Sequence, residues 1–516
     1  MKVKIVILYF IIFCLSKTNA QQDFVMYHMP SIPQITQVDP ASIPDSKLDI
    51  GLPIISRVYG SVFNTGFSFN DLFYKTPSGS TMADMDNAIK KMKPNNFLVL
   101  NFSTDLLFLG FRHEKDYYSF NVTEKLDYTF NYPEDLVTMA LEGNGRNLLG
   151  RRASFDGLGM DFTHWREYAF HWAHDVNHKF SYGARIKYLY GMENFTTKVS
   201  NMGMHTDQQT HALTFDMTFE FRTSGLPLLM IDDSTEGIGA IDVSSNEINQ
   251  EAGFEQGFYN NYYFGRKNRG VGIDIGFNYH INDKLLLEGS LLDIGFIRWK
   301  SYTSNSSLSQ WNYTYSGIEN PIEMFGGSGT SVQFLKEILE DSVENALRNN
   351  FTYSNPTYHT SLRTKFYASM EYIVDHNNFV SLTTYSSFIR NRFRIGVGLA
   401  YNYHFKHWLS ATASYAIYNR SYSNIGIGFS ANAGPAEFFL MTDNILAVFM
   451  PENVKNTLVN FGFNLTFGRE KPDTYKEEPA SMTSSDKKKS GNKRKKSNLK
   501  DSKPDNNISR KVTDKL

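Results

Sequence analysis

A strict two-residue alternation near the C-terminal end constrains this chain more than any other feature. In the stretch 457–467 every second position from Val459 on is apolar, and the positions between are small or polar. This is the period of a β-strand with an apolar environment on one face and a polar one on the other. The apolar positions are Val459, Phe461, Phe463, Leu465 and Phe467. A soluble sheet produces the same pattern, so one strand alone does not indicate a membrane barrel.

The same alternation recurs along the chain, and this repetition favours a barrel. It is visible in residues 182–190, 213–221, 271–279, 393–403 and 425–433. In the block 357–467 the strands are joined by turns that are alternately short and longer, which is typical of outer-membrane barrels. We therefore predict an all-β protein, a transmembrane antiparallel β-barrel of about 14 strands within residues 47–468. We expect residues 457–467 to form the closing strand of this barrel.

Composition agrees with this fold class. Aromatic residues make up 15% of the 516 residues, although the mean hydropathy is only -0.38. Many aromatic residues with a low mean hydropathy are expected when half of each strand faces a polar lumen. No segment offers about 18 consecutive apolar residues, so we expect no helical membrane span.

Two long loops are expected to interrupt the barrel, at 225–268 and 301–356. Short helices are predicted in the loops, within 71–93 and 133–141 and at 331–347, where apolar residues recur with helical spacing. A hairpin that ends at Arg222 would place the loop 225–268 on the wrong side of the membrane. The sequence leaves this conflict open.

The N-terminal residues indicate export. Lys2 and Lys4 precede the apolar run 5–15, and small residues lead to Ala20. This is the pattern of a signal peptide of residues 1–20, with cleavage near Ala20, and it predicts a protein of the cell outer membrane. The single cysteine, Cys14, lies within that peptide. The mature chain would then have no thiol for a disulfide, a nucleophile or a metal site.

The two regions that flank the predicted barrel differ in character. Residues 21–46 are Pro-rich and irregular, and they form either a loose arm or a plug inside the barrel. Residues 469–516 carry fifteen basic and eight acidic residues among Ser, Asn and Pro. We expect a disordered periplasmic tail there. It could be attracted to an anionic polymer or to lipid head groups, or serve only solubility. With a signal peptide and a barrel before it, this tail is not expected to bind nucleic acid.

Several polar side chains fall on the face of a strand opposite its apolar face, and we expect them to line the lumen. These candidates are Asp216, Glu220, Arg222, Asp274, Asn278, His280, Arg392, Arg394 and Asn402.

No constellation of residues indicates catalysis. His164, His171, His174 and His178 are close in sequence, but in a strand His171 and His174 point to opposite faces, which argues against a shared metal site. The Gly- and Ser-rich stretch 327–331 fits neither a nucleophile elbow nor a phosphate-binding loop. We expect no enzyme activity, no metal and no cofactor.

Several short motifs resemble an uncharacterised, domain-of-unknown-function family of Gram-negative outer-membrane barrels. The motifs are Val38-Asp39-Pro40-Ala41, Leu52-Pro53, Asn64-Thr65-Gly66-Phe67-Ser68, Gly143-Asn144-Gly145, the stretch 183–191, the stretch 293–299 and Thr442-Asp443-Asn444. More distantly, the triplet Asp39, Pro40 and Ala41 resembles the Asn-Pro-Ala of long-chain fatty-acid transporter and secretion-associated barrels, with Asp39 replacing Asn. That resemblance implies about 14 strands and an N-terminal plug.

Two functions follow as hypotheses. The first is passage of a small hydrophobic or amphipathic molecule through the barrel. The alternative is a structural or assembly barrel that scaffolds surface or secretion proteins without solute flux. The expected partners are outer-membrane lipid and the barrel-insertion machinery, for which the resemblance implies that Phe467 is the recognised terminal aromatic residue. The oligomeric state is left open.

Overall fold

The computed structural model describes residues 23–225, 267–316, 350–390, 392–405, 408–418 and 421–469. The predicted signal peptide, nearly all of the predicted tail, most of the loop 225–268 and the predicted helix 331–347 lie outside these ranges. Residues 1–471 form one compact unit, and the fold below is that of its described part.

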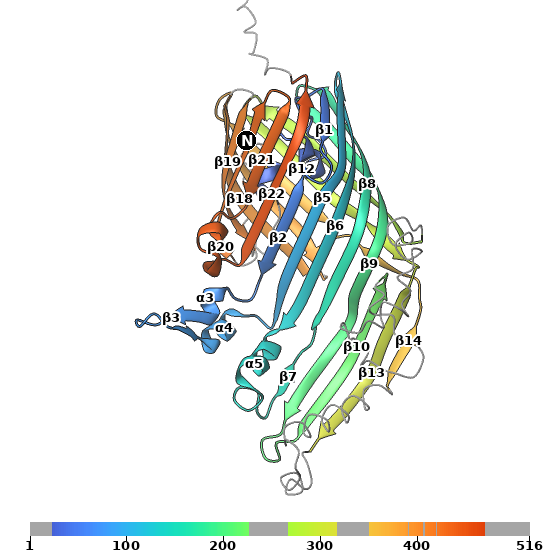
Figure 1. Cartoon of the computed structure of the whole chain (residues 1–516), viewed down its shortest axis with the longest axis vertical. Coiled ribbons are helices and arrows are strands. Elements are labelled where there is room, and N and C mark those ends of the chain that lie inside the picture. Colours follow the sequence, from blue (N-terminus) through green and yellow to red (C-terminus); the bar gives the residue numbers. More distant parts are fainter. Residues whose placement is uncertain are drawn as a thin grey trace, which may run out of the picture. The chain divides into compact units, whose positions relative to one another are not determined.

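Fourteen antiparallel strands pair in a closed ring, which confirms the predicted class and strand number (Figure 1). Two of the fourteen are each interrupted once. They are β1 (Leu48–Gly51) continued by β2 (Val58–Asn64), and β15 (Tyr358–Ser361) continued by β16 (Lys365–Ile373). The others are β5 (Asn95–His113), β6 (Asp116–Pro133), β8 (Gly159–Asn177), β9 (Phe180–Thr206), β11 (Arg269–Asn282), β12 (Leu285–Trp299), β17 (Asn378–Ile389), β18 (Arg392–Phe405), β19 (Leu409–Tyr418), β20 (Ser421–Ala433), β21 (Ala436–Thr442) and β22 (Asn456–Phe467).

The ring closes where β22 pairs with both parts of the first strand. Phe467 lies opposite Leu48 on β1, and Phe461 lies opposite Val58 on β2. Along β22 the odd positions 459–467 are exposed or half-buried on the outer face, whereas Asn460 and Asn464 are fully buried on the inner one. The strand thus separates an apolar outer face from a polar inner face, as its alternation predicts.

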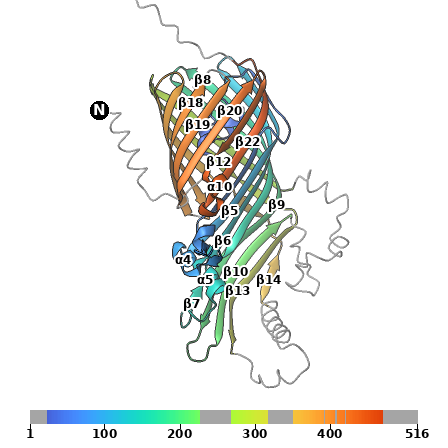
Figure 2. The ribbon, with the colours of Figure 1, turned by 60° about the vertical axis from the view of Figure 1, so that its left-hand side comes forward.

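Part of the same sheet extends beyond the ring at one end. It is formed by the outer half of β9 with β10 (Leu213–Ser224), β13 (Thr303–Tyr315), β14 (Phe351–Ser354) and the short β7 (Arg152–Ser154) (Figures 1 and 2). Within the predicted loop 301–356 there are therefore two strands, β13 and β14. We call this part of the sheet the extension, and the end of the barrel that carries it the loop end. The opposite end, with the tight turns at 114–115, 283–284 and 434–435, is the short-turn end.

The extension resolves the conflict over the loop 225–268. β9 continues beyond the ring and is followed by β10. Among the described strands, β10 pairs with β9 of the ring and with β13 of the extension. The chain then re-enters the ring at Arg269, which lies opposite Tyr190 on β9. Because β10 is not a strand of the ring, both ends of the segment 225–268 lie at the loop end.

Short helices and one hairpin complete the fold. The predicted helices within 71–93 and 133–141 correspond to α4 (Met85–Lys91) and α5 (Glu134–Glu142), with Pro133 as the N-cap of α5. The others are α2 (Phe24–Tyr27), η1 (Pro33–Gln37), α3 (Phe69–Leu72), α10 (Leu446–Phe449) and η4 (Pro451–Asn453), and the hairpin pairs β3 (Phe73–Lys75) with β4 (Thr81–Ala83). Among the described residues, no helix has the length and apolar character needed to cross a membrane.

The N-terminal segment 23–46, which carries α2 and η1, lies inside the ring, and we call it the plug. Phe24, Val25, Met26 and Ile32 are at most 1% exposed. They form the largest buried apolar cluster of the described chain together with wall residues such as Tyr367. The sequence predicts a polar inner face for the wall. Where the plug packs against it, however, the inner face carries aromatic side chains. An apolar plug stabilises such a wall because the contact removes both surfaces from water.

Candidate functional site

The plug is fastened to the barrel wall through the motif Asp39-Pro40-Ala41. Asp39 accepts hydrogen bonds from the backbone of Ala41 at 3.0 Å and from Asn278 on β11 at 3.0 Å. The carbonyl oxygen of Pro40 accepts a hydrogen bond from His171 on β8 at 2.8 Å. The carboxylate of Asp39, where the fatty-acid transporter barrels have Asn, thus joins the plug to the wall.

Glycines in the wall allow this close approach. A Cβ atom at Gly183 would lie 1.8 Å from the carbonyl oxygen of Pro40, far inside van der Waals contact. A Cβ atom at Gly276 would lie 3.0 Å from the ring of Pro40. Only residues without a side chain allow the plug backbone to lie this close to β9 and β11.

The start of the plug is held by a residue beyond the end of β21. The two carboxylate oxygens of Asp443 accept hydrogen bonds from the backbone N–H groups of Phe24 and Val25, at 3.3 and 3.1 Å. Burial, followed by the neighbouring carboxylate of Asp23, raises the pKa of Asp443 to about 7. Asp443 belongs to the motif Thr442-Asp443-Asn444, which is one of the motifs that carry the family resemblance. The sequence alone gives no role for this motif.

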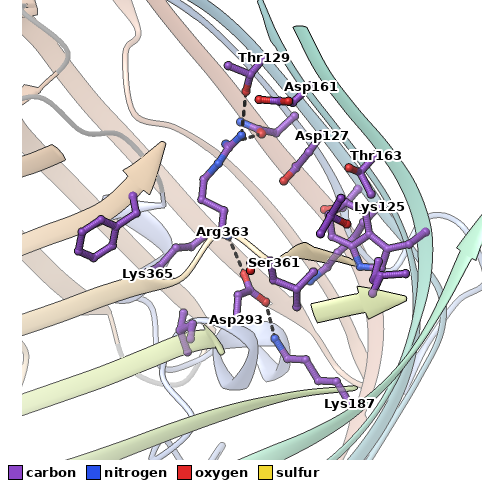
Figure 3. Close-up of a pocket in the computed structure, with 18 of the residues that line it drawn as sticks. Lys125, Asp127, Thr129, Asp161, Thr163, Lys187, Asp293, Ser361, Arg363 and Lys365 are labelled. Carbon is purple, nitrogen blue, oxygen red and sulfur yellow. Dashed lines mark hydrogen bonds and ion pairs between the residues drawn. The ribbon is translucent and has the colours of Figure 1, made fainter. Parts of the chain in front are cut away.

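Beside the plug, the lumen holds a cavity of about 410 Å³. The described residues that line it come mainly from the plug and from β2, β5, β6, β8, β9, β12, β15, β16 and β17, so the cavity spans the barrel interior. Seven of the lining residues are Lys or Arg and four are Asp. Figure 3 shows several of these charged side chains converging on the open space. We call this space the lumen cavity.

A buried ionic network forms part of the wall of this cavity. Arg185 bonds Glu167 at 3.0 Å and Asp274 at 2.8 Å, and Lys187 lies 2.6 Å from Asp274. Asp293 links Lys187 to Lys365, which lies 3.1 Å away (Figure 3). Buried charges are stable only when they are paired in this way, so the network fixes the positions of the lysines at the cavity.

Arg363 differs from the paired lysines of this network, because its partners are neutral. It lies in the interruption between β15 and β16 and reaches across the lumen. Its guanidinium donates to the side-chain oxygen of Asn101 at 3.1 Å and to the hydroxyl of Thr129 at 3.0 Å (Figure 3). Both partners are neutral, so its charge is not neutralised by these bonds.

The cavity also has an apolar side. Trp165 and Ile297 line it and belong to a buried cluster with Leu189, Trp299 and Tyr358. Leu292 lines it as well and belongs to the cluster around the plug. The cavity therefore offers an apolar wall and an excess of cations to one ligand.

The predicted lumen-lining residues are divided between two places. Asp274, Asn278 and His280 lie inside the ring: Asp274 is in the ionic network, Asn278 bonds the plug, and His280 lines a second cavity at the short-turn end. Arg394 lies over the ring of Phe97 at 4.5 Å. Asn402 is buried and accepts a hydrogen bond from Thr412 at 2.7 Å. The side chain of Arg392, the first residue of β18, lies outside the described part.

The other three candidates do not line the barrel lumen. Asp216, Glu220 and Arg222 lie on β10, which is part of the extension and not of the ring. Asp216 pairs with Arg152 of β7, and Arg222 bonds Glu220 at 2.8 Å. The alternation of β10 reports two environments for its two faces, and it does not reveal which part of the sheet the strand joins.

The histidines of β8 do not converge. His164 bonds Glu124 at 2.7 Å, and His174 bonds Asp116 at 2.8 Å. His171 bonds the plug, as described above. Each imidazole therefore has a separate partner.

A closed ring of fourteen antiparallel strands, an apolar outer face and a plug inside define a transmembrane β-barrel of the outer-membrane type. Within this class, the chain belongs to a family of unknown function, DUF5723, whose model matches residues 40–443. The family membership expected from the motifs is thus confirmed. No curated protein matches the chain.

Solved structures with a similar arrangement include several outer-membrane barrels. The toluene transporter TbuX of Ralstonia pickettii is 8% identical, with a TM-score of 0.38 and coverage of 84% of this chain and 94% of that one. A FadL homologue of Pseudomonas aeruginosa is 9% identical, with a TM-score of 0.36 and coverage of 84% and 94%. The translocator domain of autotransporter NalP from Neisseria meningitidis is 7% identical, with a TM-score of 0.30 and coverage of 85% and 95%. At such low TM-scores we draw nothing about function from these likenesses.

Proposed function

We propose that the protein is an outer-membrane transporter for a small amphipathic molecule with an anionic group. The observation that carries this proposal is the lumen cavity, in which an apolar wall around Trp165 faces an excess of cationic side chains. An uncharged hydrophobic molecule would remove those cations from water without replacing their hydrogen bonds, which is unfavourable. An acidic group on the same molecule would pair with them.

Arg363 is the residue that we propose to bind the acidic group. Its present partners, Asn101 and Thr129, are neutral, so an incoming carboxylate or sulfonate would supply the missing charge. A guanidinium binds such groups with two parallel hydrogen bonds, which gives both strength and orientation. The apolar part of the molecule would then lie against Trp165 and Ile297.

The plug is the proposed gate. It fills the lumen beside the cavity and is held by buried contacts with the wall. Passage therefore requires that the plug move or that it be bypassed. Deletion of residues 23–46 should raise flux, provided that the barrel still assembles.

Uptake into proteoliposomes tests the proposal. The probe is a small aromatic sulfonate, which stays charged and crosses lipid slowly, and a neutral sugar of similar size is the comparison. We expect the plug-deleted barrel to take up the sulfonate faster than the sugar. Arg363→Gln in that barrel should slow sulfonate uptake about tenfold, the equivalent of one charge-assisted hydrogen bond, and leave sugar uptake unchanged.

Arg298→Gln is the matched control, because Arg298 is exposed on β12 and does not line the cavity. Equal uptake of sulfonate and sugar would contradict the proposed selectivity. No flux of either solute through the plug-deleted barrel would favour the alternative of a structural or assembly barrel.

The remaining assignments are part of the same proposal. The outer membrane is the proposed location, with export through the signal peptide 1–20 and insertion by the barrel-insertion machinery. Contact of the basic tail with an anionic periplasmic polymer and the absence of a catalytic role are also proposed.

A further inference from the structure

A second cavity lies between the plug and the wall at the short-turn end, with a volume of about 260 Å³. Its described lining includes four carboxylate side chains, those of Asp39, Asp175, Glu288 and Glu371, and three histidines, but no Lys or Arg. Unlike the lumen cavity, this space has only acidic and imidazole groups to interact with a charge. A cation is therefore the complementary ligand.

Three of these groups converge closely. One ring nitrogen of His28 and one carboxylate oxygen each of Glu288 and Glu371 lie within 4.8 Å of one another. Glu288 is on β12 and Glu371 is on β16, where they are diagonal neighbours, because Glu288 lies opposite Ser369. His28 follows α2 and belongs to the plug. The two carboxylates of the wall therefore meet an imidazole of the plug.

The hydrogen bonds of His28 leave one nitrogen available for a ligand. Nε2 lies 2.7 Å from the hydroxyl of Thr383, and that hydroxyl donates to Ser369 at 3.0 Å. Because the hydroxyl proton is used in this way, Nε2 carries the hydrogen and Nδ1 keeps its lone pair. Histidines that bind metals are typically oriented by such a bond from the other nitrogen.

Two atoms of this group have no protein partner in the described chain. They are Nδ1 of His28 and Oε2 of Glu288, and both are buried in residues less than 9% exposed. Leaving a buried acceptor without a partner costs free energy, and a lone pair beside two carboxylates adds repulsion. A bound cation removes both costs.

We propose that His28, Glu288 and Glu371 bind a divalent transition-metal ion that fastens the plug to β12 and β16. One imidazole nitrogen with two carboxylates is a donor set that suits zinc, and water in the adjoining cavity completes the coordination. Ligands in a tetrahedral zinc site lie about 2.0–2.2 Å from the metal, so the two glutamates move inward by roughly 1 Å on binding. This inference concerns the anchoring of the plug and does not depend on the transported molecule.

The test uses the untagged full-length chain with Cys14→Ser, which removes its one native thiol, refolded in detergent with a chelator that is then removed. Zn²⁺ alone is titrated in by calorimetry at pH 7.5, and folding is checked by the heat-modifiable gel shift. We expect one Zn²⁺ per barrel. His28→Ala and Glu288→Gln should each weaken binding at least tenfold, and His211→Ala, an exposed histidine of the extension, should have no effect.

A second measurement separates binding at this site from loss of the plug fold. Plug docking is reported by the rate of thiol labelling of a cysteine introduced at Ser42, which is 7% exposed, and of one introduced at Thr36, which is 1% exposed and does not line the cavity, so that its thiol cannot bind the metal there. Zn²⁺ should slow the labelling in the wild-type background and not in Glu288→Gln, whose side chain keeps its shape. Absence of saturable binding, or binding in both His28→Ala and Glu288→Gln that equals that of the wild type, would overturn the proposal.

Discussion

The carbonyl oxygen of Pro40 lies 2.8 Å from Nε2 of His171, so the second residue of the plug motif is bonded directly to the barrel wall. The contact joins residues that are 131 positions apart in the chain. It is possible because Gly183, on the neighbouring strand β9, has no side chain at the point where Pro40 approaches. The plug is therefore positioned by the shape of the wall as well as by its own apolar residues.

Gly183→Ala should displace the plug. Its Cβ atom would lie 1.8 Å from the oxygen of Pro40, and a backbone atom cannot move as a flexible side chain does. Labelling of the cysteine at position 42 measures the displacement, and we expect it to accelerate while the barrel still shows a heat-modifiable gel shift. Gly60→Ala on β2 is the control, because no atom lies within 4 Å of its added Cβ. Equal labelling rates in the two variants would contradict this account.

Plug docking should weaken as the pH rises toward 8. The pKa of Asp443 is raised from 3.8 to about 7, first by burial and then by the carboxylate of Asp23. A raised pKa in the docked state means that docking favours the protonated form, so stability is greatest at low pH and is lost as the pH passes through about 7. The backbone N–H groups of Val25, Phe24 and Asp23, which donate to Asp443, oppose the effect.

Opening of the plug, followed as conductance steps in a planar bilayer with chelator present, measures this pH dependence. Openings should be more frequent at pH 8 than at pH 5 in the wild type. Asp443→Asn should reduce the difference, because the amide does not titrate, and Asp39 of the plug, whose pKa burial raises to about 6, should account for part of what remains. A variant that keeps the full pH dependence would show that another group is responsible.

Substitutions on β10 should leave transport unchanged. Asp216 and Glu220 belong to the extension, so they do not contact a molecule inside the ring. Asp216→Asn breaks a half-exposed ion pair with Arg152, and such pairs contribute only about 0–1 kcal/mol. Sulfonate uptake by the plug-deleted barrel should therefore equal that of its parent in Asp216→Asn and in Glu220→Gln. A drop comparable to that of Arg363→Gln would mean that the extension takes part in selectivity.

Phe467→Ala should impair assembly more than removal of all residues after Gly468. Phe467 ends β22, the closing strand, and 41% of its surface is exposed on the outer face, where we propose that the insertion machinery recognises it. The ring closes through described strands that precede the tail, because β22 pairs with β1 and β2. The amount of heat-modifiable barrel in the outer-membrane fraction measures assembly. Wild-type amounts of Phe467→Ala would refute the prediction.

The sequence alone determined the local structure of this protein and the class to which it belongs. The alternation in β22 and β11 places Val459 and Ile273 outside and Asn460 and Asp274 inside, as the structure has them. That information is local. The period of two follows from the geometry of a single strand, and the difference between its two faces follows from the apolar surroundings of the barrel on one side and the polar lumen on the other.

Tertiary structure decided which strands pair and what fills the lumen. The same alternation placed Asp216 in the lumen, whereas the pairing of β10 puts it in the extension. Arg363 and the cluster of His28, Glu288 and Glu371 carry no sequence signal, because their members meet only after the ring closes and the plug enters. Contacts between residues hundreds of positions apart depend on the register of the whole ring, and no short stretch of sequence records that register.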